Sequence, residues 1–183
     1  MSLNKGILLD NYQELSLFVF YNSNQLLSLY CIPSHGGSCR FSNVVSFSDG
    51  ALGNNTGTPY FYLTPLDPSA ADVAADPRAS LAVSAMPLGT CGDADPESPV
   101  CAKLTLSGEL HRVLDPEELS FAEHALFTRH PEMQTWPKDH NFHVFKLVLA
   151  NVFLINGFGG PRHITLEQYY SASSDIPVSK LTV

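Results

Sequence analysis

The feature that most constrains the fold is a two-residue alternation over residues 102–111, within a predicted strand at 102–113. Apolar or small residues, among them Leu104, Leu106 and Leu110, alternate there with polar or charged residues. A period of two places one set of side chains on a buried face and the other in water, as in a strand of an antiparallel sheet. Residues 79–86 alternate in the same way and predict a second strand.

Residues 142–158 are apolar over too long a stretch for one simple strand. The parity of their apolar positions changes near Ala150-Asn151, which predicts a bulge or a bend there. Residues 60–66 are rich in aromatic side chains and predict another strand, and residues 41–48 predict a strand that ends at the turn sequence Ser48-Asp49-Gly50.

Two short helices have clear start signals. Asp67-Pro68 and Asp115-Pro116 each place an N-cap residue before a proline at the first helical position. Glu118 follows the second cap by three residues, as in a capping box. We expect these helices to end near Pro77 and Pro131.

The order of elements is therefore mostly strands, with short helices between them. This order favours a mainly β fold, an antiparallel sheet closed into a barrel, over a parallel β-α-β fold. With 183 residues and 44% hydrophobic content, the chain suits one compact domain.

The charge and hydropathy of the chain exclude two classes of partner. Its 10 Lys and Arg against 18 Asp and Glu give a net charge of −8, and the basic residues are scattered, so we expect no nucleic-acid binding. No apolar stretch reaches the roughly 18 residues of a membrane span. The start of the chain shows no clear signal peptide, because Lys5 is followed by Asp10 and Glu14 before any apolar run.

Five phrases, in this order, are similar to the CREG ("cellular repressor") family. They are Asn-Val-Val-Ser-Phe-Ser-Asp-Gly at 43–50, Gly-Thr-Pro-Tyr-Phe-Tyr-Leu at 57–63, Phe-Thr-Arg-His-Pro-Glu-Met-Gln-Thr-Trp-Pro at 127–137, Phe-Gly-Gly-Pro at 158–161 and Glu-Gln-Tyr-Tyr at 167–170. The phrase at 127–137 is the most specific. Thr90-Cys91-Gly92 with Cys101 looks more like plant members of the family than animal ones.

The resemblance implies an antiparallel split β-barrel of the FMN-binding, pyridoxamine-phosphate-oxidase-like type, with short inserted helices. It places the barrel domain at residues 31–170, between an atypical N-terminal segment, 1–30, and a C-terminal tail, 171–183. The first 30 residues do not match the family's usual start, and only residues 28–35 loosely echo its first strand.

The resemblance further implies a homodimeric glycoprotein that is secreted or endolysosomal. It implies that the protein binds a protein partner or a glycan receptor, and that it acts in growth or differentiation control without catalysing a reaction. The alternative is an FMN-dependent oxidoreductase. A third interpretation, a nuclear corepressor, rests on the family's name alone and conflicts with the acidic charge.

A flavin phosphate needs cationic side chains or clustered donors. Working oxidases of this fold carry a basic residue shortly after the second strand, where this chain has Asp49. Arg78, Lys146 and Arg162 remain as weak phosphate candidates, and nothing in the sequence brings them together. We therefore expect no cofactor, with FMN as the alternative.

Cys91 and Cys101 flank a loop between two predicted strands, and the secretory setting that the resemblance implies would allow a disulfide between them. Two free thiols are the alternative in a reducing compartment. Cys31 and Cys39 form a second, weaker candidate pair. No close Cys-x-x-Cys pair supports zinc.

Three further sets of residues have a functional and a structural interpretation. Asn54-Asn55-Thr56 is an N-glycosylation acceptor if the chain enters the secretory pathway. His124, His130, His140 and His143 are spaced unlike ligands on one helix face, so we expect no metal site. Asp93, Asp95 and Glu97 form an acidic loop, which a solvated turn explains better than calcium.

The residues Arg129, His130, Met133 and Trp136 follow the longer predicted helix. They are candidates either for a packing corner, with Met133 and Trp136 in the core, or for a dimer interface. The packing interpretation is the favoured one.

Overall fold

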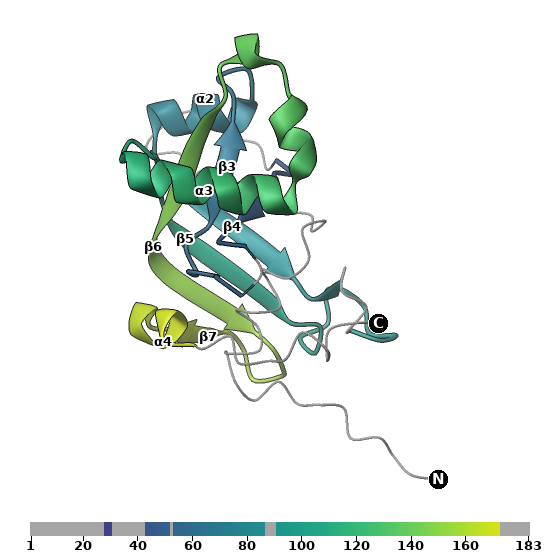
Figure 1. Cartoon of the computed structure of the whole chain (residues 1–183). Helices are drawn as coiled ribbons and strands as arrows, with labels where there is room; N and C mark the ends of the chain where they lie inside the picture. Colours follow the sequence, from purple (N-terminus) through teal and green to yellow (C-terminus); the bar gives the residue numbers. More distant parts are fainter. Residues whose placement is uncertain (1–27, 31–42, 52, 87–90, 173–183) are drawn as a thin grey trace.

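The computed structural model describes residues 28–30, 43–51, 53–86 and 91–172. They form one curled antiparallel sheet, a half-barrel with few helices, as the sequence predicted (Figure 1). The strands are β1 (Ser28–Tyr30), β2 (Phe47–Ser48), β3 (Tyr60–Leu63), β4 (Arg78–Ser84), β5 (Lys103–Arg112), β6 (His143–Ile155) and β7 (Arg162–Ile164). Their order is β1-β4-β5-β6-β3-β2, and β7 also pairs with β6.

The long strand β6 organises the sheet, because three strands pair with it. Strand β5 follows one of its edges, while β3 pairs near its start and β7 near its end. The register shifts where Ser107 faces Asn151 and Gly108 faces Leu149, which leaves Ala150 unmatched. The bulge predicted at Ala150-Asn151 is thus confirmed.

Gly108 makes this bulge sterically feasible. A Cβ atom at this position would lie 1.9 Å from the carbonyl oxygen of Val148, on the opposite strand. Any side chain would therefore force the two backbones apart.

The described helices are α2 (Pro68–Ala75), α3 (Pro116–Arg129) and α4 (Leu166–Tyr170), and two 3₁₀ turns, η2 (Pro131–Thr135) and η3 (Lys138–His140), follow α3. Both predicted N-caps are confirmed, since Asp67 accepts from the amide of Ser69 and Asp115 accepts from that of Glu118. The side chain of Glu118 does not complete a capping box. It accepts instead two hydrogen bonds from Lys146, at 2.8 and 2.6 Å.

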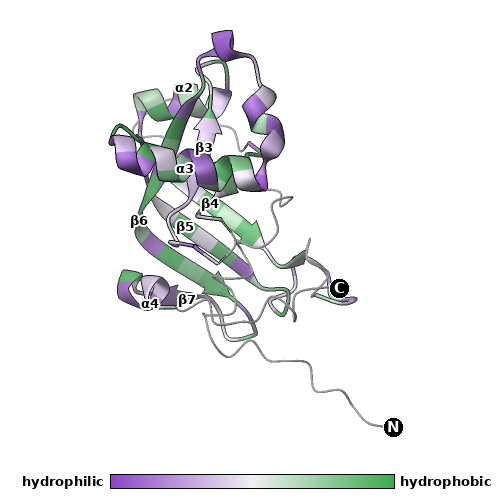
Figure 2. Ribbon diagram, in the orientation of Figure 1, coloured by the Kyte–Doolittle hydropathy of each residue, from purple (hydrophilic) through white to green (hydrophobic). Residues whose placement is uncertain are grey.

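The molecule has two hydrophobic cores, which lie on opposite faces of the sheet at strand β3. Along β3, Phe61 and Leu63 point into the half-barrel, where they join Leu106, Leu147 and other strand residues. Tyr60 and Tyr62 point outward and are covered by α3. Figure 2 shows the resulting alternation of hydrophobic and hydrophilic bands along β5 and β6.

Two predicted strands are shorter than their sequence pattern. β3 ends at Leu63 because Thr64 begins a turn, in which its carbonyl accepts from the amide of Asp67. β2 holds only Phe47 and Ser48. Within the described residues, no helix is long and apolar enough to cross a membrane.

Candidate functional site

The corner after α3 is fixed by two side chains that reach back to the β2 turn. Arg129 Nε donates to the carbonyl oxygen of Gly50 at 3.0 Å. The ring of His130 makes a 2.9 Å hydrogen bond through Nε2 to the carbonyl oxygen of Phe47, so this nitrogen is the donor. Burial lowers the pKa of His130, which favours its neutral form.

Asp49 lies under this corner and has no exposed surface. Its carboxylate accepts from Asn55 Nδ2 at 2.6 Å and from the amide of Gly57 at 3.0 Å, and the guanidinium of Arg129 lies 3.9 Å away. Burial raises the pKa of Asp49 to about 6, although these donors and the nearby charge oppose the shift.

The loop that Asp49 holds is shaped by two glycines. At Gly50, with φ near 156°, a Cβ atom would lie 2.0 Å from the carbonyl oxygen of Asn54. Gly57 adopts a left-handed φ of 78°, and its carbonyl accepts from the hydroxyl of Tyr169 in α4 at 2.9 Å. The glycosylation candidate Asn54 is exposed in this loop.

The inward position of Asp49 corrects one step of the sequence argument. That step placed its carboxylate where it would repel a bound phosphate, whereas the structure points it into the protein and pairs it with internal donors. The carboxylate that does line an open groove is Asp67, the N-cap of α2. It accepts from Asn43 Nδ2 at 3.1 and 3.2 Å and from the amide of Ser69 at 2.7 Å.

This groove, which we call the aromatic groove, has a volume of about 430 Å³. Its walls come from the residues just before β2, from β3 and from the segment after α3. Three stacked or tilted rings form one side: Tyr62, Trp136 and Phe142, with centroids 4.9 to 6.0 Å apart. Asp67 is the single charged residue among its described lining residues. A planar, uncharged or cationic ligand suits these walls better than an anion.

The three phosphate candidates lie on different parts of the sheet. Arg78 on β4 forms an ion pair with Asp76 at 2.6 Å, and Lys146 near the start of β6 pairs with Glu118. Arg162 on β7 faces Leu154, near the other end of β6. The described residues therefore contain no cluster of these three cations.

The sequence analysis missed the network that occupies Lys146. The hydroxyl of Tyr60 donates to Glu118 Oε1 at 3.2 Å, so α3, β3 and β6 share one carboxylate. Burial, with the charge of Glu118, raises the pKa of Tyr60 to about 12, so its hydroxyl stays protonated. No local signal links these three residues, because the sheet register brings them together.

The four residues of the corner all contact the body of the domain. Arg129 and His130 bind the β2 turn, as described above. Met133 is buried in the core beneath α3, and Trp136 packs against it beside Tyr62.

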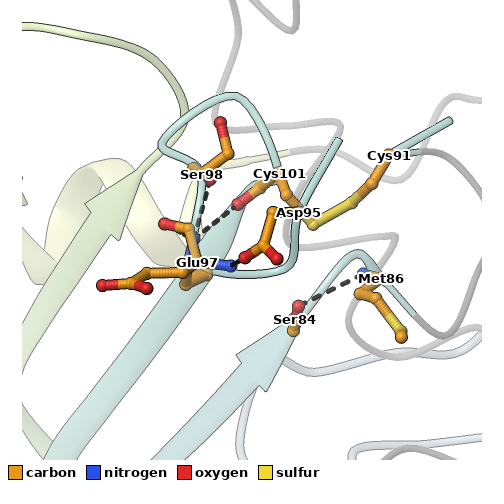
Figure 3. Close-up of a disulfide and its surroundings, with 8 residues drawn as sticks. Ser84, Met86, Cys91, Asp95, Glu97, Ser98 and Cys101 are labelled. Atoms are coloured by element: carbon orange, nitrogen blue, oxygen red, sulfur yellow. Dashed lines mark hydrogen bonds between the residues drawn. A yellow bond between two sulfur atoms is a disulfide. The ribbon is translucent and has the colours of Figure 1, made fainter. Parts of the chain in front are cut away.

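The structure joins Cys91 and Cys101 by a disulfide (Figure 3). Cys101 is fully buried and follows a loop in which the amide of Glu97 donates to Asp95 and that of Cys101 to the carbonyl of Ser98. The second candidate pair, Cys31 and Cys39, lies outside the described residues.

Metal-binding clusters are absent from the described part of the chain. No three His, Cys, Asp or Glu side chains gather there in a way that could hold an ion. His130 is bound to a backbone carbonyl, and His140 lies against Phe142.

Comparison with known families gives a match over most of the chain. The family described as "CREG, beta-barrel" matches residues 22–171. Human CREG1 is 41% identical over 135 residues, which cover 73% of this chain and 61% of that protein. CREG1 of Gallus gallus is 42% identical, with 72% of this chain and 70% of that protein covered.

Solved structures with the same fold are more distant in sequence. A heme-binding protein of Mycobacterium smegmatis superposes with a TM-score of 0.65 at 22% identity, covering 87% of this chain and 60% of that one. Campylobacter jejuni ChuZ superposes with a TM-score of 0.61 at 14% identity, covering 85% of this chain and 59% of that one. At these identities the likeness establishes the split-barrel fold alone.

Proposed function

The chain belongs to the CREG β-barrel family, and we propose that it acts as a homodimeric secreted or endolysosomal glycoprotein that binds partners in growth or differentiation control and catalyses no reaction. It spans 61% of the length of human CREG1, so the activity of a whole family member is part of this proposal.

The observation that carries the non-catalytic proposal is the charge of the aromatic groove. A flavin mononucleotide would need its phosphate neutralised or held by several donors. The charged group lining this groove is the Asp67 carboxylate, and its bonds to Asn43 and Ser69 occupy the donors that a phosphate would use. The residues that line the aromatic groove thus do not fit the phosphate end of this cofactor.

The alternative, an FMN-dependent oxidoreductase, is supported by the three rings of the aromatic groove, since a planar ring system can stack on them. A titration of the purified protein with flavin distinguishes the two proposals. We expect FMN fluorescence to be unchanged by the wild-type protein. Saturable quenching with one flavin per chain would instead support the oxidoreductase, and Trp136→Ala would then weaken that binding.

The outer face of β4, β5 and β6 supports the dimer proposal. Its centre carries small or uncharged side chains in register, with Ser80 opposite Ser107, whose hydroxyl oxygens are 2.7 Å apart, and Ala82 opposite Thr105. Phe153 faces Thr105 from β6. A face with an uncharged centre on a strongly acidic chain suits a second copy of itself, because like charges would not meet at that centre.

Substitution at the centre of this face tests the dimer. Light scattering of the wild-type protein should give twice the 20.0 kDa chain mass, and Thr105→Arg should give one chain mass. Thr128→Arg, on an exposed part of α3, is the matched control and should stay dimeric. A monomeric wild-type protein at micromolar concentration would refute the proposal.

The secretory part of the proposal draws on the Cys91–Cys101 disulfide, which needs an oxidising compartment, and on the exposed Asn54 acceptor. We expect the protein secreted from eukaryotic cells to lose mass on treatment with N-glycosidase, and Asn54→Gln to lack that response. A glycan-free secreted protein would remove the glycoprotein assignment.

A further inference from the structure

A second groove opens at the mouth of the half-barrel, beneath α2. It has a volume of about 480 Å³ and is separate from the aromatic groove, although Leu63 borders both. Figure 1 shows α2 at the end of the sheet where β6 begins. The groove exists because the side of α2 that faces this end carries Ala70, Ala71 and Ala74, whose methyl groups leave space that longer side chains would fill.

The floor of this mouth groove continues the inner face of the half-barrel. Leu63 and Leu110 are buried there, and Phe145 is half-buried beside them. The cross-strand pairs decide which other residues share that face. Leu63 stands opposite His143, and Phe145 stands opposite Arg112, so both basic residues project on the same side as the apolar floor.

The side chains of Arg112 and His143 form no hydrogen bond or ion pair with any other residue that the structure describes, whereas those of Arg78 and Lys146 form ion pairs. Partial burial of the imidazole lowers the pKa of His143, and the nearby guanidinium charge of Arg112 lowers it further. His111, at the groove edge, is paired with Glu109 at 2.9 Å. Among the described residues that line the mouth groove there is no carboxylate.

We propose that the mouth groove binds a small amphipathic anion, with its headgroup held by Arg112 and His143 and its apolar body lying between the alanines of α2 and Phe145. Barrel mouths are common ligand sites, and the groove volume lies in the range of small-molecule pockets. A carboxylate or phosphate head gains charge-assisted hydrogen bonds from Arg112, and burial of the apolar body supplies the rest of the affinity.

Decanoate, used below its micelle concentration, is the probe for calorimetric titration of the full chain. We expect saturable binding of one decanoate per chain, while decanol and inorganic phosphate, which each lack one half of the ligand, bind at least tenfold more weakly. A comparison of decanoate with decyl phosphate then identifies the preferred head.

Two variants test the two halves of the site. Arg112→Gln should weaken decanoate binding at least tenfold, a loss typical of one charge-assisted bond, whereas Lys138→Gln on exposed η3 should not. Ala74→Leu should block the groove, while Ala75→Leu, one residue further along α2 and outside the groove lining, should bind normally. Both alanines are exposed on a helix, so neither change should impair folding.

Three results would overturn the proposal. They are absence of decanoate binding to the wild-type protein, decanol binding as tightly as decanoate, and unchanged binding by Arg112→Gln or Ala74→Leu. Because these experiments measure neither flavin binding nor dimer formation, their failure would leave the proposed function unaffected.

Discussion

Replacing Asp49 by Asn tests whether a buried carboxylate makes this protein more stable in acid. The side chain of Asp49 is fully buried beneath the corner formed by Arg129 and His130. The groups that face it are the amide of Gly57, the side chain of Asn55, the guanidinium of Arg129 and the ring of Tyr169. Arg129 is the one cation among them.

The sign of the effect follows from the direction of the pKa shift. Burial raises the pKa of Asp49 from 3.8 to about 6. Between these two values the folded state binds more protons than the unfolded chain, so the free energy of unfolding rises as the pH falls. A difference of about two pH units corresponds to about 3 kcal/mol, which is fully present below about pH 4 and is lost as the pH rises through about 6.

Urea unfolding of the wild-type protein and of Asp49→Asn, measured at about pH 7, 6, 5 and 4, gives this contribution as a difference. The wild-type protein should gain about 2.5 kcal/mol, most of the full effect, relative to the variant over this range. The lowered pKa of His130 makes the protein less stable in acid. Because His130 is present in both proteins, its contribution cancels in the difference. A difference that stays constant with pH, or one that shrinks in acid, would refute the assignment of Asp49 as a buried, proton-binding group.

Three further predictions concern the framework. Gly108→Ala should destabilise the protein by several kcal/mol or prevent folding, because its Cβ would meet the opposite backbone at 1.9 Å. Gly157→Ala is the control, because no atom lies within 4 Å of the added Cβ. Equal thermal stability of the two variants would argue against the bulge geometry. Leu126→Ala, beneath α3 and fully buried, should cost about 2–5 kcal/mol in urea unfolding, and a loss below about 1 kcal/mol would mean that α3 is loosely packed. Reduction of the disulfide at Cys101 should lower the free energy of unfolding by about 3 kcal/mol, the chain-entropy value for so short a loop, and no change on reduction would indicate that the bond is absent in solution.

Elements whose signals are local in the chain were predictable from the sequence. The alternation over residues 102–111 specifies β5, and the two Asp-Pro pairs specify the starts of α2 and α3. The bulge at Ala150 was visible as a change of parity, because each core position must keep its side chain inside.

Features that depend on the pairing of distant strands were not predictable from one sequence. The burial of the Asp49 carboxylate is one example, because its partners Asn55 and Arg129 are brought to it by a glycine-rich loop and by the end of α3. The same holds for Arg112 and His143, which share a face only through the registers of three strands.

One available signal was overlooked. The aromatic run from Tyr60 to Leu63 lacks the polar positions of a half-exposed strand, which indicates cover on both faces. This pattern would have predicted that α3 packs on the outer face of β3.

The measurement that tests the central claim most directly is equilibrium binding of FMN to the purified protein, followed by flavin fluorescence and by retention through gel filtration. Because the Asp67 carboxylate occupies the donors at the polar end of the aromatic groove, we predict that FMN elutes apart from the protein and that its fluorescence stays unquenched. Co-elution of one FMN per chain, with quenched fluorescence and a flavin absorbance band, would contradict a function by binding alone.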